Sequence, residues 1–256
     1  MAGDRERLAH RGDAILSGRE LTYGTGRETH LGPLDVDIRT GACTVIMGAN
    51  GAGKSVLVRL LHGLVKPSGG KVLWRGGDMT ASDRQRQAMV FQRPVLLRRS
   101  VLANLRFVLR VRGIEPTERA ALEQAALDAA QLGHAAHRPA RRLSAGEQQR
   151  LAVAQALATA PEVLFLDEPT ASLDPASTLA IEAQIAAARV RGVTIVLVTH
   201  DIAQARRLGE DVIFLADGGV AEQGRATEVL TAPNSQDVRA WLTGDLHLIA
   251  GGQTKN

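Results

Sequence analysis

The chain has 256 residues, of which 45% are hydrophobic, 23% are charged and only 3% are aromatic, and its net charge is +4. This length suits one large domain, or a core with a subdomain. A single cysteine, Cys43, excludes an internal disulfide, and no uninterrupted apolar stretch reaches the roughly 18 residues of a membrane-spanning helix. We therefore expect a globular protein of a reducing compartment, with Cys43 as a small buried side chain and no signal-peptide core at its first seven residues.

The first informative region combines a strand, a glycine-rich loop and a helix. Residues 44–47 are apolar and predict a strand, residues 48–55 read G-x-x-x-x-G-K-S, and apolar residues then recur at helical spacing until the Pro-Ser-Gly-Gly run at 67–70. This combination is typical of a phosphate-binding loop, in which backbone N–H groups and a helix N-terminus surround the phosphates. We expect Lys54 to reach the β and γ oxygens and the Ser55 hydroxyl to ligate Mg²⁺. The nucleotide-binding residues predicted here are Gly48, Asn50, Gly51, Ala52, Gly53, Lys54, Ser55 and Val56.

The rest of the chain alternates predicted strands with helices. Further strands are predicted at 72–74, 88–91, 163–166, 193–198 and 212–215, as in a parallel α/β sheet. Residues 95–145 read as helical, with Leu122, Ala125, Ala129 and Leu132 on one face and Gly133 as a stop. We expect a core of about 14–94 and 160–245, an inserted helical subdomain of about 95–159, and a frayed end at 251–256.

Two adjacent carboxylates, Asp167 and Glu168, follow the apolar run at 163–166. A buried strand that ends in carboxylates can bring charge to a phosphate-bound metal, because Mg²⁺ prefers oxygen ligands. Asp167 is the predicted metal ligand, and Glu168 can polarise the attacking water as general base. Together with the phosphate-binding loop, this segment predicts binding and hydrolysis of a nucleoside triphosphate with Mg²⁺.

Several further motifs occur in the order found in one family. Tyr23 precedes the phosphate-binding loop, Gln92 follows a predicted strand, residues 143–150 read LSAGEQQR, residues 171–174 read ASLD, and His200 follows another strand. On this ordered set, the chain resembles the ATP-binding subunits of ATP-binding cassette (ABC) transporters over nearly its whole length. The resemblance implies one ABC-type nucleotide-binding domain over residues 1–256. Its fold would be a P-loop NTPase core with a mixed, mainly parallel sheet, an N-terminal antiparallel β region and an inserted helical subdomain.

The resemblance also implies roles for these residues. Tyr23 would stack on adenine, Gln92 would sense Mg²⁺ and the γ-phosphate, and His200 would donate to the γ-phosphate. The catalytic set is then Glu168, His200, Gln92 and Lys54, and the metal set is Ser55, Gln92 and Asp167. Ser144, Gly146 and Glu147 would begin a helix pointing at ATP bound by a second copy in a head-to-tail dimer. Residues 143–150 resemble the signature segment of the family. This segment differs from the commonest form of the signature in having Ala145 in place of Gly and Glu147 in place of Gln.

The implied partners are integral membrane permease subunits and, indirectly, a solute-binding protein, at the cytoplasmic face of the inner membrane. Residues 89–101 are similar to the corresponding run of oxyanion importers, for tungstate in particular and phosphate more distantly. A polar amino acid importer is the alternative within transport. An ABC ATPase acting on nucleic acid or ribosomes is a further alternative, disfavoured because no coiled-coil heptads and no aromatic-interleaved basic patch occur, so no nucleic acid is expected.

Overall fold

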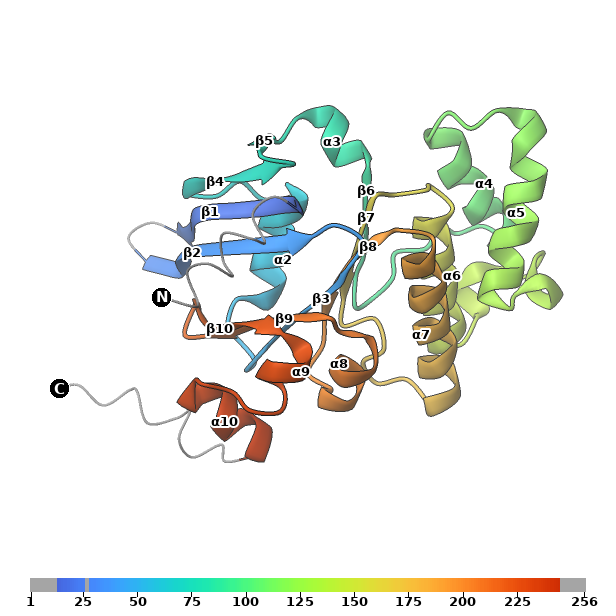
Figure 1. The fold of residues 1–256 in the computed structure, drawn as a ribbon. Helices are drawn as coiled ribbons and strands as arrows, with labels where there is room; N and C mark the ends of the chain where they lie inside the picture. The colour runs from blue at the N-terminus through green and yellow to red at the C-terminus, as the bar shows by residue number, and fades with distance from the viewer. Residues whose placement is uncertain (1–12, 26–27, 245–256) are drawn as a thin grey trace. The chain divides into compact units, whose positions relative to one another are not determined.

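The computed structural model describes residues 13–25 and 28–244. The expectations for the first seven residues and for 251–256 therefore lie outside the described residues. The chain divides into two compact units. The first unit comprises residues 1–84 and 196–256, and the second comprises residues 85–195 (Figure 1).

The first unit contains an antiparallel sheet with the strand order β2-β1-β4-β5. Every adjacent pair in this sheet is antiparallel, and Figure 1 shows the strands side by side. The strands are β1 (Ala14–Thr25), β2 (Glu28–Arg39), β4 (Gly69–Trp74) and β5 (Gly77–Asp78). This sheet is the antiparallel β region expected near the N-terminus.

A second set of strands includes β3 (Cys43–Gly48). Every residue of β3 is buried. In the first unit, β3 pairs in parallel with β9 (Asp211–Ala216), and β9 pairs antiparallel with β10 (Gly219–Arg225). Such a continuous apolar run fits a parallel strand covered on both faces, and Cys43 is 1% exposed, as expected. The helices of this unit are α2 (Lys54–His62), α3 (Ala81–Gln85, which ends at the boundary), α8 (Ile202–Leu208), α9 (Ala226–Val229) and α10 (Gln236–Thr243).

Helix α2 ends earlier than the sequence suggested. Its last residue is His62, and Gly63 caps it in the left-handed conformation with φ of 81°. Leu64, expected on the apolar face, is 52% exposed. The prediction that residues 67–70 end the helix was therefore wrong. A glycine at this position ends a helix without the steric cost that a side chain would bring.

The second unit joins parallel strands to a group of helices. Strand β7 (Val163–Asp167) pairs in parallel with β6 (Gln87–Val90), and β8 (Thr194–Val198) spans the division between the units. The predicted strands at 88–91, 163–166 and 193–198 correspond to these three. The helices are α4 (Val101–Val111), α5 (Pro116–Ala130), α6 (Ala145–Leu157) and α7 (Pro175–Val190), with short 3₁₀ turns η1 (Gly133–Ala135) and η2 (Ala140–Arg142).

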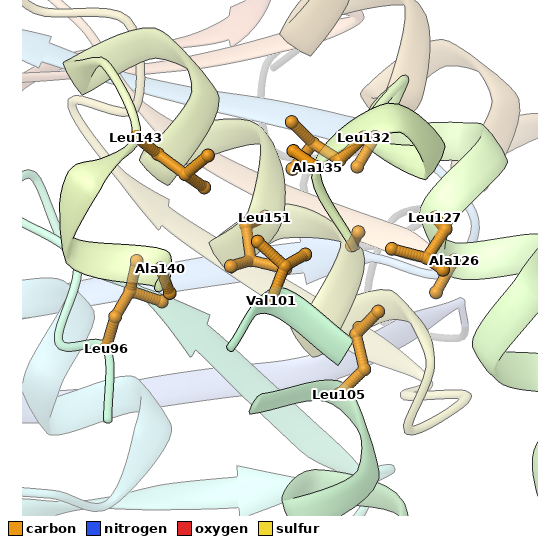
Figure 2. Packing of buried hydrophobic residues seen from close by; sticks show 12 residues of the cluster. Leu96, Val101, Leu105, Ala126, Leu127, Leu132, Ala135, Ala140, Leu143 and Leu151 are labelled. Carbon is orange, nitrogen blue, oxygen red and sulfur yellow. The ribbon is translucent and has the colours of Figure 1, made fainter. Parts of the chain in front are cut away.

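The helices of the second unit pack around an apolar core of their own. Figure 2 shows Val101 and Leu105 of α4 with Leu127 of α5 and Leu151 of α6 in this core. Asn104 is fully buried among them, and its amide donates to backbone oxygens, including that of Ser100 at 2.9 Å. Within residues 13–25 and 28–244, no helix is both long enough and apolar enough to cross a lipid bilayer.

The apolar face of α5 differs from the predicted one. The helix buries Ala126, Leu127 and Ala130 together with Glu123, whereas Ala125 and Ala129 are exposed. The face was misassigned because alanines occur all around this helix and blur its periodicity. The helix also ends at Ala130, and its cap is Gln131 in the left-handed conformation rather than Gly133.

Gln184 is an unusual polar side chain in the buried face of α7. It is 5% exposed, and among the described residues neither its Oε1 nor its Nε2 has a hydrogen-bond partner. A buried amide without partners costs about 1–3 kcal/mol of desolvation. We therefore expect Gln184→Met, which keeps the side-chain length, to raise the free energy of unfolding by about that amount. Urea denaturation measures it, with exposed Gln236→Met as the control. A destabilised Gln184→Met protein would show that the amide is satisfied.

Candidate nucleotide-binding site

The phosphate-binding loop lies in the first unit, between β3 and α2. Gly48, Gly51 and Gly53 all have positive φ, of 137°, 85° and 95°. Gly48 ends β3 beside the backbone of Leu215 in β9, and a Cβ at this position would overlap the Leu215 carbonyl oxygen and lie 3.1 Å from its carbon. A side chain at residue 48 would therefore force β3 and β9 apart at the mouth of the loop.

Lys54 is held against the inside of this loop. It is 7% exposed, and its ammonium donates to the carbonyl oxygens of Gly48 and Ala49, each at 2.9 Å. Ala52 is buried as well, and its N–H donates to the Ala49 carbonyl at 3.2 Å. These contacts fold the loop around the lysine side chain.

The start of α2 suits an anion. Its N-cap, Gly53, provides no side-chain cap, and the first turn carries no acidic residue. A helix N-terminus has free N–H groups and a partial positive charge, so it attracts a phosphate when no side chain occupies it. Asn50 and Gly51 are exposed, whereas Ser55 and Val56 are half-buried in the first turn of the helix. The residues present therefore fit a bound phosphate chain, and the Ser55 hydroxyl in the first turn is of the type that Mg²⁺ takes as a ligand.

Tyr23 and His200 also belong to the first unit. Tyr23 is half-buried in β1, and its ring centroid lies 6.5 Å from that of His30. His200 is exposed and lies two residues after β8. Its neighbour Asp201 caps α8, because the Asp201 carboxylate accepts from the N–H groups of Ala203 and Gln204. The roles of Tyr23 in adenine stacking and of His200 in γ-phosphate binding remain predictions.

Replacing the Tyr23 ring tests its predicted stacking. We expect Tyr23→Ala to weaken ATP binding by about 1–3 kcal/mol, the range for a base stacked on an aromatic ring. Tyr23→Phe should bind nearly as the wild type does, since the ring face is kept. Equilibrium titration with a fluorescent ATP analogue measures both. If Phe were as damaging as Ala, the hydroxyl rather than the ring face would make the contact.

The carboxylates lie in the second unit at the end of β7. Asp167 is the last residue of the strand and is 6% exposed. Glu168 follows with φ of 48°, a left-handed conformation that a residue with a side chain adopts at a cost of about 1–3 kcal/mol. Gln92, two residues beyond β6, donates from Nε2 to Glu168 Oε2 at 3.4 Å. The fold thus brings Gln92 and Glu168 together, and the strained backbone at Glu168 is of the kind that gathers at functional sites.

The signature segment forms a capping box at the start of α6. The Ser144 hydroxyl accepts from the N–H of Glu147 at 3.2 Å, and Glu147 Oε2 accepts from the N–H of Ser144 at 2.7 Å. The Ser144 N–H lowers the pKa of Glu147, against an opposing effect of burial. Glu147 Oε1 also lies 3.8 Å from Nε2 of His134, which belongs to the same unit. Glutamate at residue 147 therefore fixes the signature turn within its own chain.

The capping box predicts a pH-dependent contribution to stability. A folded-state pKa below the ordinary value of 4.5 favours the folded state above about pH 4.5, and this stabilisation is lost as the pH falls through the lowered pKa. We expect Glu147→Ala to cost about 1 kcal/mol at pH 7, and the difference from wild type to shrink below pH 4.5. Urea denaturation across this range measures it, with Glu147→Gln as the uncharged control. A difference that is constant with pH would contradict the ionised cap.

Two contacts of α6, made by Gly146 and by Gln149, were not foreseen from the sequence. Gly146 packs against the start of α7, where an added Cβ would overlap Ser177 Oγ and lie 2.6 Å from Ser177 Cβ. Asp174 caps α7 by accepting from the N–H and the hydroxyl of Ser177, at 2.8 and 2.6 Å, and these bonds lower the pKa of Asp174. Gln149, 2% exposed, donates to the Phe91 carbonyl at 3.2 Å. A glutamine in a buried helix face was the available signal for the latter contact.

Comparison with known proteins shows the family of this chain. The sequence profile described as ABC transporter matches residues 31–171. The chain is 36% identical to the phosphate import ATP-binding protein PstB 2 of Natronomonas pharaonis, covering 93% of this chain and 89% of that protein. It is 35% identical to a probable anion import ATP-binding protein of Haloferax volcanii, and the match covers 93% of this chain and 90% of that protein. It is 38% identical to the methionine import ATP-binding protein MetN of Caulobacter vibrioides, and the match covers 86% of this chain and 69% of that protein.

Solved structures share the fold. The cbiO1 subunit of a Clostridium perfringens ABC transporter complex superposes with a TM-score of 0.78 at 31% identity, covering 93% of this chain and 99% of that chain. A dimeric ATP-binding cassette bound to ADP and Pi superposes with a TM-score of 0.72 at 29% identity, covering 83% and 99%. The predicted fold class is therefore confirmed. The chain belongs to the ABC transporter family, and it is an ATPase of that family.

Proposed function

We propose that this protein is the ATP-hydrolysing subunit of a membrane importer. The single observation that carries the proposal is the phosphate-binding loop, with Lys54 folded inside it and an uncapped helix N-terminus. The import role is supported by relatives named for phosphate, anion and methionine import. We propose one nucleotide-binding domain, with a core of about 14–94 and 160–245 and a helical subdomain of about 95–159.

The proposed chemistry divides among few residues. Loop N–H groups and Lys54 would neutralise the triphosphate, and Ser55, Asp167 and Gln92 would hold Mg²⁺, which supplies positive charge to the phosphate oxygens. Glu168 would accept a proton from the attacking water, while His200 would donate to the γ-phosphate. The hydrogen bond between Gln92 and Glu168 supports their assignment to one catalytic group.

We further propose that two copies associate head to tail through ATP. In such a dimer Ser144, Gly146 and Glu147 of one copy face the nucleotide of the other, so that hydrolysis removes the link and drives the permease. The dimeric cassette among the structural neighbours supports this assembly. The N-terminus of α6 supports it too, because the capping box leaves other first-turn N–H groups for an anion. Permease subunits would hold the protein at the cytoplasmic face of the membrane.

The proposed cargo is an oxyanion such as tungstate or phosphate. The relatives named for phosphate and anion import support this class, as does the run at 89–101. Methionine import relatives of similar identity favour an amino acid as the second candidate.

Reconstitution with candidate importer permeases tests the proposal. ATP hydrolysis should rise in the complex and respond to solute-loaded binding protein. Tungstate, molybdate, phosphate and an amino acid mixture would be compared, each with its binding protein. Stimulation by amino acids alone would replace the oxyanion with the second candidate. No stimulation, together with tight binding to ribosomes or DNA, would overturn the import role itself.

A further inference from the structure

A cavity of about 330 Å³ lies between α4 and α5 in the second unit, outside the residues assigned to ATP. Alanines line part of it and leave it open, while three arginines and one glutamate supply its charge. The charged residues are Arg106 and Arg110 of α4 and Arg119 and Glu123 of α5. Their formal charges sum to +2. We call this cavity the arginine pocket.

Two of the three arginines are positioned through Nε. Arg106 Nε donates to both carboxylate oxygens of Glu123, each at 3.0 Å, and Glu123 is 7% exposed. Arg119 Nε donates to the Ile114 carbonyl oxygen at 2.6 Å. Because Nε is engaged in each case, the guanidinium plane is fixed while the terminal amino groups stay available. A fixed guanidinium loses less freedom when it binds an anion than a freely rotating one does.

The terminal nitrogens of Arg106 and Arg119 have no acceptor within residues 13–25 and 28–244, and the side chain of Arg110 forms no hydrogen bond or ion pair there. Several like charges therefore surround one cavity with a single carboxylate against them. That excess of positive charge attracts an anion, and planar guanidinium groups suit the oxygens of a tetrahedral oxyanion. Simple ion pairing with Glu123 does not account for it, since Glu123 neutralises only Arg106.

We propose that the arginine pocket binds a tetrahedral dianion, either a free oxyanion or the phosphate group of a monoester. Arg110 and Arg119 supply most of the binding, and Arg106 contributes through its terminal nitrogens. This site is separate from the phosphate-binding loop and goes beyond the proposed ATPase role, because it gives the helical part of the chain a second anionic ligand.

Isothermal titration at low ionic strength tests the pocket. Inorganic phosphate, tungstate and glycerol 3-phosphate are titrated in turn into the full chain with a non-hydrolysable ATP analogue and Mg²⁺ present, so that the analogue occupies the phosphate-binding loop up to the γ-phosphate position. The inorganic anions distinguish a free oxyanion from a phosphate monoester. We expect saturable binding of at least one probe at one site per chain. Binding should weaken at least tenfold in Arg110→Gln and in Arg119→Gln, as expected for the loss of a charge-assisted hydrogen bond.

A matched variant and a fold control complete the experiment. Arg191→Gln removes an exposed arginine from the same unit, outside the pocket, and should bind as wild type does. Arg106 is left unchanged, because its removal would leave the buried Glu123 unpaired. Thermal unfolding confirms that each variant is folded. Absence of saturable binding, equal affinity in all variants, or binding that disappears when the ATP analogue fills the loop would each overturn the proposal. Failure of the ATP analogue to bind would instead count against the proposed ATPase site, and the arginine comparison would still decide the pocket.

Discussion

Glu168→Gln should lower ATP turnover by about 10²–10⁴-fold while ATP binding persists, because an amide cannot accept the proton that a general base removes. Glu168 directly follows β7 in a left-handed conformation and is hydrogen-bonded to Gln92, so the isosteric amide preserves its packing. The variant should also accumulate as a dimer under ATP and Mg²⁺. Phosphate release and light scattering measure the two effects.

Glu162→Gln is the matched control for this experiment. Glu162 lies beside the other end of β7 and pairs with Arg86 at 3.1 Å, both partly exposed. Its substitution should leave turnover close to wild type, because surface ion pairs contribute little. Wild-type hydrolysis by a monomeric Glu168→Gln protein would contradict both the base assignment and the ATP-linked dimer.

Gly146→Ala should reduce turnover by about two orders of magnitude, since misplacing a positioning group by about 1 Å can cost that much. The added methyl group would lie 2.6 Å from Ser177 Cβ, so either α6 or α7 must move. Gly146→Ala combined with Ser177→Gly removes the obstructing side chain and should recover most of the activity. Comparing kcat and KM for ATP in the single and double variants measures this coupling.

The neighbouring position provides the control. Ala145 is exposed, so Ala145→Ser should leave turnover nearly unchanged. If the double variant were as inactive as Gly146→Ala, the glycine would be needed for its contact with a second copy's nucleotide. Its packing on α7 would then not explain the effect.

Local patterns predicted the buried strands of the fold. The apolar runs before Gly48, Asp167 and His200 predicted β3, β7 and β8, because a buried strand leaves a continuous hydrophobic signal. The family resemblance placed the start of α6 at Ser144, Gly146 and Glu147, where the structure has a capping box. The family resemblance added the antiparallel sheet.

Contacts between distant segments could not be predicted in this way. The packing of Gly146 on Ser177 joins two helices, and the bond from Gln149 to Phe91 joins a helix to a strand end, at separations where sequence spacing carries no signal. The apolar face of α5 was missed for another reason, because alanine is compatible with both exposed and buried positions. The end of that helix was missed because its left-handed cap is Gln131 instead of glycine.

The two carbonyl oxygens that hold Lys54 have a consequence for nucleotide exchange. The ammonium group donates to Gly48 and Ala49 inside the loop, at 2.9 Å each. A phosphate that binds Lys54 would therefore compete with these hydrogen bonds or share the ammonium group with them. Between one ATP and the next, the same two bonds would keep the loop folded around the lysine.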